Sequence, residues 1–265
     1  MVDEMRATPG VQHGLGRMAL VTGGLGDIGL AIALRLAADG YGVTVVDLPV
    51  DTDGEQRLAN ASADLSLPGS LRYRHGDVTD REQMAAVVES MPGLHVGIAN
   101  AGTVRSAPFL EITPDQWSQH LDVNLTGAFV TAQLCAQRFV RDRTAGLLLF
   151  TGSWVADIPW PDITAYTATK AALQMVAKQA ARELAPYGIR ANTVAPGIVR
   201  AGLARSQMEN DPQYATRAAQ VIPLKAFQTV EQVADVFAFL SSPAATYMTG
   251  TTVLVDGGAS LFAVD

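Results

Sequence analysis

The sequence Met18-Ala-Leu-Val-Thr-Gly-Gly-Leu-Gly-Asp-Ile-Gly29 runs from a short apolar stretch into a glycine-rich turn. Residues 18–22 have the composition of a buried β-strand, and residues 28–38 have the apolar spacing of a helix that ends at Gly40. Glycines in such a turn let the backbone come close to a ligand, and the following helix points free N–H groups at an anion. The stretch therefore predicts a strand, a turn and a helix arranged to hold a phosphate group.

The same alternation of strand and helix continues along the chain. Strands are expected over residues 42–47, 71–75, 94–99, 146–151, 189–194 and 251–255, and helices over 81–90, 114–141, 164–185 and 230–240. Almost continuously apolar strands, each followed by a helix, indicate a parallel sheet covered on both faces. We expect an α/β chain with a doubly wound Rossmann fold and a seven-stranded sheet. Residues 17–265 would form one catalytic domain with a substrate loop near 200–225, after a flexible lead-in over residues 1–16.

Composition excludes several other classes of protein. Of the 265 residues, 48% are hydrophobic and 17% are charged, which is too apolar for a disordered chain. The formal net charge of -7 argues against nucleic acid or an anionic membrane as a partner, because both bind clustered Lys and Arg. The sequence has no uninterrupted apolar run of about 18 residues, and its start does not resemble a secretory signal. We expect a cytoplasmic protein that acts on a small molecule.

Cysteine and histidine give no sign of a metal site. Cys135 is the single cysteine, which excludes an intramolecular disulfide and a Cys-rich zinc site, and its apolar neighbours place it in a helix core. The four histidines are scattered without ligand-like spacing, so metal catalysis is not expected. They are His13, His75, His95 and His120.

An acid after the second strand indicates which dinucleotide would bind. Asp47 ends that strand, where a carboxylate can accept hydrogen bonds from both ribose hydroxyls of an adenosine and would repel a 2′-phosphate. Leu48 follows it, and the glycine turn carries no Lys or Arg to pair with such a phosphate. The pattern predicts NAD rather than NADP. The alternative is an acid that only caps a turn at the end of a strand.

At these positions the chain resembles the short-chain dehydrogenase/reductase family, from about residue 17 to residue 260. The resemblance implies an NAD-dependent oxidoreductase that acts on a sugar, a polyol or another secondary alcohol. The matching pieces occur in the family's order and at compatible spacing. They are Thr22-Gly23 with Gly29, Gly76-Asp77-Val78, Asn100-Ala101-Gly102, Asn124, Ser153, Tyr166-x-x-x-Lys170, Pro196-Gly197 and Tyr247-Met-Thr-Gly-x-x-x-x-Val-Asp-Gly-Gly258.

The resemblance also implies a set of cofactor contacts, with two departures from the family pattern. Asp27 stands where the family usually has glycine, and we expect its side chain to point away from the pyrophosphate or to cap the helix. Ala201 replaces a Thr that often binds the nicotinamide carboxamide, so main-chain groups nearby would do more of that work. The implied contacts are Gly23, Gly26, Asp27, Ile28, Gly29, Asp47, Leu48, Asp77, Val78, Asn100, Ala101, Gly102, Tyr166, Lys170, Pro196, Gly197, Ile198 and Val199.

Tyr166 and Lys170 are four residues apart in an expected helix, so both side chains project from one face. A neighbouring ammonium favours a phenolate and should lower the pKa of Tyr166, which makes this residue the candidate general acid/base. Ser153 follows a buried strand, where its hydroxyl can orient the substrate oxygen. The resemblance implies that Asn124 lies in a bent helix that holds a water, and that this water relays protons from Lys170 to solvent.

Substrate contacts are expected between Ser153 and the catalytic helix. Trp154 and Trp160 are candidate walls and Asp157 is a candidate polar contact, together with Ser153 and Tyr166. Alternatively, the tryptophans pack against the sheet edge or a subunit. The loop at 200–225 is long enough for a lid, and Arg105 is expected to face the same opening. The side chains singled out in that loop are Arg200, Arg205, Met208 and Tyr214.

Several alternatives for the function remain open at this point. The site also suits a carbonyl reductase for cyclic or acidic ketones, and a non-catalytic NAD(H)-binding protein on the same fold is possible. Reduction of an enoyl double bond is disfavoured, because that variant of the family spaces its Tyr and Lys differently. The resemblance further implies a homotetramer that packs through the long helices at 114–141 and 164–185.

Overall fold

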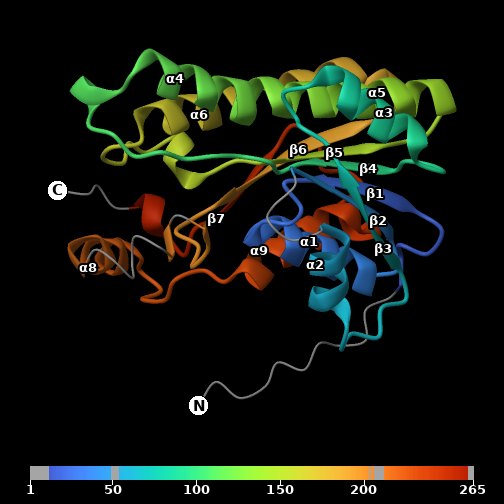
Figure 1. Cartoon of the computed structure of the whole chain (residues 1–265), viewed down its shortest axis with the longest axis horizontal. Helices are drawn as coiled ribbons and strands as arrows, with labels where there is room; N and C mark the ends of the chain where they lie inside the picture. The colour runs from blue at the N-terminus through green and yellow to red at the C-terminus, as the bar shows by residue number, and fades with distance from the viewer. Residues whose placement is uncertain (1–11, 49–53, 203, 206–211, 262–265) are drawn as a thin grey trace.

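The computed structural model describes residues 12–48, 54–202, 204–205 and 212–261. Its centre is a seven-stranded sheet in the order β3-β2-β1-β4-β5-β6-β7 (Figure 1). Every neighbouring pair is parallel, which confirms the expected doubly wound sheet. The strands are β1 (Met18–Thr22), β2 (Gly42–Asp47), β3 (Ser70–His75), β4 (Val96–Ala99), β5 (Leu147–Thr151), β6 (Arg190–Pro196) and β7 (Thr252–Val255).

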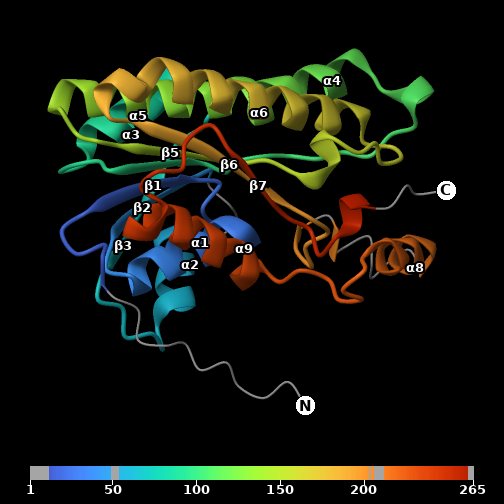
Figure 2. The ribbon, with the colours of Figure 1, turned by 180° about the vertical axis from the view of Figure 1, so that it is seen from behind.

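Helices cover both faces of the sheet (Figures 1 and 2). One layer holds α3, α4, α5 and α6, and the other holds α1, α2 and α9, while α8 lies beyond one end of the sheet. The helices are α1 (Asp27–Ala38), α2 (Gly54–Ser62), α3 (Arg81–Ser90), α4 (Pro114–His120), α5 (Ala128–Asp142), α6 (Thr164–Leu184), α8 (Pro212–Val221) and α9 (Val230–Ser241).

The two layers bury opposite faces of the strands. In β1, Val21 belongs to the apolar core under α1 and α9, whereas Leu20 belongs to the core under α3, α5 and α6. In β2, Val45 and Val46 divide in the same way. Successive strand residues point to opposite faces, so a strand buried on both sides must be apolar at nearly every position. This requirement explains the continuous apolar runs in the sequence.

β1 lies between β2 and β4, and this position creates the crevice in which a ligand can bind. Met18 pairs with Gly42 of β2 on one side, and Ala19 pairs with Val96 of β4 on the other. The chain therefore passes from β1 to β2 on one side of β1, and later from β3 to β4 on the other side. These connections diverge, so a crevice opens beyond the carboxyl ends of β1 and β4. The glycine turn and the Asn100-Ala101-Gly102 segment directly follow these two ends.

The expected long helix at 114–141 contains an irregular segment. After α4, a π-helical segment, η2 (Leu121–Gly127), precedes α5. Thr113 begins α4 with a capping box, in which its side chain accepts from the amide of Gln116 and Gln116 binds back. Such π segments occur often at functional sites, and this one contains Asn124.

One helix, α2, is not expected from the sequence, because it buries only Gly54 and Leu58 and therefore has a weak apolar pattern. Within the region 200–225, where the sequence predicts a loop with short helical pieces, residues 212–221 form α8.

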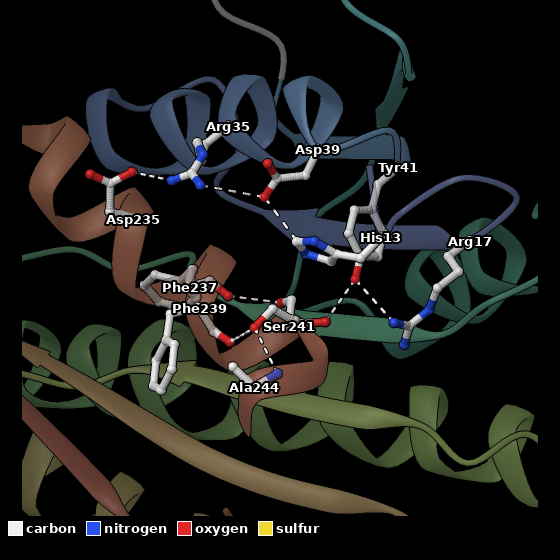
Figure 3. Close-up of polar contacts among 11 residues, drawn as sticks. His13, Arg17, Arg35, Asp39, Tyr41, Asp235, Phe237, Phe239, Ser241 and Ala244 are labelled. Atoms are coloured by element: carbon white, nitrogen blue, oxygen red, sulfur yellow. Dashed lines mark hydrogen bonds and ion pairs between the residues drawn. The ribbon is translucent and has the colours of Figure 1, made fainter. Parts of the chain in front are cut away.

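A polar network joins the chain before β1 to α1 and α9 (Figure 3). His13 lies 3.8 Å from the buried carboxylate of Asp39, and Arg35 lies 3.6 Å from the same group and also pairs with Asp235. The Tyr41 hydroxyl accepts from Arg17 at 3.2 Å and donates to a backbone carbonyl of α9 at 2.8 Å. The network lies at the amino-terminal edge of the sheet, opposite the crevice.

Cys135 is fully buried against Gly97, and burial raises the pKa of its thiol to about 12, so it is the core residue that the sequence predicted. Within the described ranges, no group of three or more His, Cys, Asp or Glu side chains could hold a metal ion. No helix in this part of the chain is both long enough and apolar enough to cross a membrane.

Candidate active site

A cleft of about 720 Å³ opens at the carboxyl ends of the central strands. It runs from the end of β2 past β1 and β4 to the start of α6. All the cofactor contacts implied by the resemblance line this cleft, as do Ser153, Trp154 and Trp160. Asn124 lies behind the wall, with 1% of its surface exposed. The residues singled out from the sequence therefore come together along one cleft.

The glycine turn comes within contact distance of the segment after β4. Gly23 has φ +62°, and a Cβ there would lie 2.7 Å from the Cα of Ala101. A Cβ on Gly29 would lie 2.2 Å from the carbonyl oxygen of Gly23. Asn100 fixes the turn by donating from Nδ2 to the carbonyls of Thr22 and Gly23, at 3.0 and 3.2 Å. This cradle needs glycine, and its open side faces the cleft at the amino end of α1, as a pyrophosphate requires.

Asp47 presents a fixed carboxylate at the far end of the cleft. Its Oδ2 accepts from the amide of Leu25 at 2.9 Å, and its Oδ1 accepts from the amide of Leu48 at 2.8 Å. Each carboxylate oxygen keeps a further lone pair for a hydroxyl donor. Among the described residues, Lys170 is the only Lys or Arg that lines the cleft, and it belongs to the opposite end.

Asp27 does not cap α1 through its side chain. The N-cap is Gly26, and no side-chain hydrogen bond caps this helix. The Asp27 carboxylate instead accepts from the amide of Gly202 at 2.8 Å and pairs with Arg205 at 3.2 Å. The departure from the family pattern thus connects the start of α1 to the segment after β6.

The residues after β6 leave main-chain donors on the cleft. The Gly197 amide donates to Val255 at 2.9 Å, and the Ile198 carbonyl accepts from Gln228 at 3.1 Å. Within the described part of the chain, the amides of Ile198 and Val199 have no acceptor. They are the groups that the sequence expected to compensate for Ala201, and both residues line the cleft.

Lys170 and Tyr166 lie together at the base of the cleft. The Lys170 ammonium is 5.4 Å from the centre of the Tyr166 ring and donates to the Thr151 carbonyl at 2.7 Å. Burial lowers the pKa of Lys170 to about 8. Burial also raises the pKa of Tyr166, and a hydrogen bond with Ser153 offsets part of that rise. The expectation of a lowered Tyr166 pKa is wrong for the protein alone, because desolvation exceeds the other influences.

Asn124 connects the π-helical segment to the loop after β4. Its Oδ1 accepts from the Thr103 amide at 2.7 Å, and its Nδ2 donates to the Thr103 carbonyl at 2.8 Å. Nδ2 also reaches the Thr169 hydroxyl at 3.3 Å, next to Lys170 in α6. A Cβ on Gly102 would lie 3.3 Å from Asn124 and 3.8 Å from the Lys170 nitrogen. Asn124 therefore joins the loop at Thr103 to α6 at Thr169, next to Lys170.

The two tryptophans form one wall of the cleft. Trp154 and Trp160 both line the cleft and pack edge to face, with ring centres 5.3 Å apart. Asp157 is not brought into the cleft, because its carboxylate accepts from Gln174 of α6 at 3.1 Å. Arg105 does not line the cleft either. Arg200 and Arg205 line a second groove, between α1 and α9, while Met208 and the Tyr214 side chain lie outside the described residues.

Several lining residues were missed from the sequence. They lie in several separate segments next to predicted positions, and only the pair at the end of α4 and in η2 had a usable signal. Val123 and Gln119 are four residues apart beside Asn124, so they share a helix face that points to the cleft. The missed residues are Val46, Gly76, Thr103, Val104, Ser106, Gln119, Val123, Thr151, Gly152, Val155, Pro161, Asp162, Ile163, Ala201, Gly202 and Ala204.

Known proteins share this arrangement over nearly the whole chain. A family model described as enoyl-(acyl carrier protein) reductase matches residues 24–260. The chain is 31% identical to 3beta-hydroxysteroid dehydrogenase 1 of Eggerthella lenta, covering 93% of this chain and 95% of that protein. It is 32% identical to L-rhamnose-1-dehydrogenase of Scheffersomyces stipitis, covering 92% and 95%. This chain belongs to the short-chain dehydrogenase/reductase family. It is an oxidoreductase that acts on CH–OH groups.

Solved structures of this family superpose closely on the chain. One is from Beutenbergia cavernae, is provisionally named an NAD(P)-dependent gluconate 5-dehydrogenase, and contains NADP at low occupancy. It has a TM-score of 0.87 and 30% identity, covering 96% of this chain and all of that one. The short-chain dehydrogenase/reductase fold supports binding of NAD or NADP in the cleft described above.

Proposed function

We propose that this short-chain dehydrogenase/reductase transfers a hydride between NAD(H) and a secondary alcohol or its ketone, with Tyr166 as general acid/base. The observation that carries the proposal is one continuous cleft. It has an anchored carboxylate at its adenosine end, and Ser153, Tyr166 and Lys170 at its other end. When bound, the nicotinamide supplies or accepts the hydride. The protein must place the carbon next to it and move the oxygen's proton.

Each residue of the reactive end has a distinct task. The Ser153 hydroxyl donates to the substrate oxygen and orients it beside Tyr166. In alcohol oxidation, Tyr166 accepts the hydroxyl proton, and in ketone reduction it returns one. Lys170 stabilises the phenolate through its charge, because its ammonium lies close to the ring. Asn124 holds the Gly102-Thr103 backbone beside Lys170 and offers a route for protons along η2.

Preference for NAD rests on Asp47. Its carboxylate is held by two backbone amides, so it cannot easily turn away from a 2′-phosphate. Apart from Lys170 at the opposite end, no Lys or Arg among the described residues lines the cleft to offset the charge of Asp47. The relative from Beutenbergia cavernae shows that NADP is used within the family, so the preference must be measured. A kcat/KM for NADP equal to or above that for NAD would remove this part of the proposal.

A sugar or a polyol is the substrate class that we favour. The Trp154–Trp160 wall can pack against the C–H face of a ring, and Ser106, Gln119 and Asp162 add polar groups to the lining. L-rhamnose-1-dehydrogenase, a relative, is named for a sugar, while 3beta-hydroxysteroid dehydrogenase 1 is named for an apolar cyclic alcohol. A ketone reductase for cyclic or acidic substrates is the alternative within the family.

The decisive experiment measures NADH formation with purified enzyme and a panel of alcohols. The panel contains sugars, polyols, cyclic alcohols and hydroxysteroids, each assayed with NAD and with NADP, and the matching ketones are assayed in reverse. We expect turnover with NAD and one or more sugars or polyols. Cofactor binding without turnover on the whole panel would indicate a non-catalytic NAD(H)-binding protein. An enoyl thioester is assayed with NADH as well, and turnover only with that substrate would match the description of the family model instead.

We also propose a homotetramer in the cytoplasm. Apolar side chains lie exposed on α5 and α6, including Phe129, Val140 and Met175, where a partner subunit could cover them. The single cysteine is a buried thiol, as suits a reducing compartment. Light scattering after gel filtration should give four times the 28.0 kDa chain mass, and a monomeric mass would contradict the proposal.

A further inference from the structure

His120 lies at the junction of α4 and η2, next to the active-site cleft but outside its lining. Only 1% of its surface is exposed. Its Nε2 lies 3.0 Å from the backbone nitrogen of Arg105, and its Nδ1 lies 2.6 Å from the carbonyl oxygen of Gln116. Both ring nitrogens are therefore occupied by main-chain partners, one on its own helix and one on the loop after β4.

These partners determine the state of the imidazole ring. A carbonyl oxygen only accepts, so Nδ1 carries the hydrogen and donates to Gln116. The Arg105 amide only donates, so Nε2 has a free lone pair and accepts. The ring is then a neutral imidazole with its hydrogen on Nδ1. A side chain without an acceptor at the Nε2 position would leave a backbone N–H unpaired beside the cleft.

His120 and Asn124 bind the same loop from one face of the helical segment. They are four residues apart, and they contact Arg105 and Thr103, which are two residues apart in the loop after β4. Farther along this stretch, the Ala107 amide donates to the carbonyl of Asp162, before α6, at 2.8 Å. The main chain of residues 103–107 is thus held at every second residue.

The anchored loop forms part of the cleft wall. The residues between the anchored ones, Val104 and Ser106, line the cleft together with Thr103. Arg105, whose amide His120 holds, does not line it. The anchoring therefore sets the position of the part of the wall that Val104 and Ser106 form.

We propose that His120 is a positioning residue that fixes the Val104–Ser106 wall of the substrate pocket through the Arg105 main chain. This inference rests on the proposed function, because the wall matters only if a substrate binds there. His120 touches neither substrate nor cofactor. Its effect on catalysis passes through the placement of Val104 and Ser106, so it should appear mainly in KM for the alcohol.

The test compares two substitutions that differ in acceptor chemistry. His120→Gln can place an amide oxygen near the Nε2 position and accept from Arg105, whereas His120→Leu keeps similar bulk without an acceptor. His75→Gln, at an exposed histidine, is the matched control. Steady-state kinetics would use the best substrate of the alcohol panel. Hydrogen exchange of the peptide covering residues 101–108 and the melting temperature would be measured in parallel.

We expect His120→Leu to raise KM for the alcohol about tenfold or more with a smaller change in kcat, since misplacement of substrate contacts by about 1 Å has effects of this order. Exchange in residues 101–108 should rise in the Leu variant, while His120→Gln stays within about twofold of wild type in KM and exchange. Unchanged KM and exchange in His120→Leu would overturn the inference. Equal losses in the Leu and Gln variants, together with a lower melting temperature, would show a structural role only. Exchange is measured without substrate, so this arm is informative even if no alcohol is turned over.

Discussion

In the role of general acid/base that we propose, Tyr166 must exchange a proton near neutral pH, yet its surroundings hold the phenol in the protonated form. Burial raises its pKa, while the hydrogen bond with Ser153 lowers it only in part. Lys170 lies in the same desolvated region, where water screens its charge less than that of an exposed lysine, and burial lowers its own pKa to about 8. The proton transfer therefore depends on charge brought by the bound nicotinamide as well as on Lys170.

Replacement of Tyr166 tests its role directly. Tyr166→Phe should lower kcat by about 10²–10⁴-fold, the range that general acid/base groups contribute. NADH binding, followed by fluorescence, should remain because the cleft keeps its shape. Tyr187→Phe, at an exposed tyrosine after α6, is the control and should leave kcat unchanged. Near-normal turnover in Tyr166→Phe with cofactor bound would refute the assigned mechanism.

Lys170 should cost the folded state free energy at neutral pH. Its pKa falls from 10.5 to about 8, equivalent to about 3 kcal/mol at about 1.4 kcal/mol per unit. Below pH 8 the lysine is protonated in folded and unfolded chains, so the full cost is present. Between pH 8 and 10.5 the folded state loses its proton first, so the cost declines and stability rises.

Chemical denaturation of Lys170→Met checks this sign. At pH 7 the variant should be inactive but at least as stable as wild type, since the hydrogen bond to Thr151 offsets only part of the burial cost. The stability of wild type relative to the variant should then rise from pH 8 to pH 10. Lys178→Met, at an exposed position of the same helix, is the control. A wild-type advantage that shrinks over this interval would have the wrong sign.

Individual site residues could be located from the sequence, but their energetics could not. The spacing of Tyr166 and Lys170 places both on one helix face whatever surrounds the helix. The pKa of Tyr166 depends on burial by segments distant in sequence, and the sequence pattern carries no measure of that burial. The position of Asp157 outside the cleft was unpredictable for a related reason. Its partner Gln174 lies within hydrogen-bond reach only after α6 has folded.

At the scale of elements, the start of α1 depends on a contact made elsewhere in the chain. Asp27 places a negative charge where the helix dipole favours anions, close to the expected pyrophosphate. Arg205 and the Gly202 amide bind that carboxylate and reduce its repulsion of a phosphate. The segment after β6 is therefore coupled to the phosphate end of the cleft.

Charge at this position should control cofactor affinity. Asp27→Asn keeps an acceptor for Gly202 but removes the charge, so the Kd for NADH should fall by about fivefold, as expected for about 1 kcal/mol of Coulomb energy. Arg205→Gln leaves the carboxylate uncompensated and should raise the Kd by a similar factor. Fluorescence titration at low and high salt measures both, and the difference should shrink at high salt. Weaker binding by Asp27→Asn would indicate that the carboxylate holds the segment more than it repels phosphate.

Element boundaries were predictable where packing and local sequence agree. β1, β2 and α3 have the expected bounds, because strong apolar patterns and turn residues mark their ends. The π-helical segment was not visible in the periodicity, because it depends on the hydrogen bonds between Asn124 and Thr103 across the chain. α2 was missed because it packs through one large apolar side chain, Leu58.

At the scale of the whole molecule, the candidate active-site cleft and the polar network around Asp39 lie at opposite edges of the sheet. The cleft occupies the carboxyl edge, and the His13–Asp39–Arg35 network occupies the amino edge (Figure 3). Asp39 follows α1, where the helix dipole disfavours an acid, and Arg35 compensates for its charge. The division of the chain into a lead-in and one catalytic unit stays a prediction.

Loss of the buried carboxylate should destabilise the fold without changing the chemistry. Asp39→Asn should lower the free energy of unfolding by about 1–2 kcal/mol, because the buried side chain loses its charge interaction with Arg35. Asp235→Asn, at a carboxylate that is 62% exposed, should cost less than about 0.5 kcal/mol. Urea denaturation measures both, and kcat/KM of the folded variants should equal that of wild type. An equal cost for the two variants would contradict the importance given to burial.

The strand order also has a consequence for synthesis on the ribosome. β4, β5, β6 and β7 lie in chain order from the centre of the sheet to one edge. Each strand that emerges during translation can therefore join an edge that is already present, without displacing an earlier neighbour. Only the step from β3 back to the free side of β1 crosses strands already made. A nascent chain stalled after β5 would already contain β1 and β4, which border the crevice, but not the residues after β6 that complete the cleft. We therefore expect this incomplete chain to resist proteolysis already.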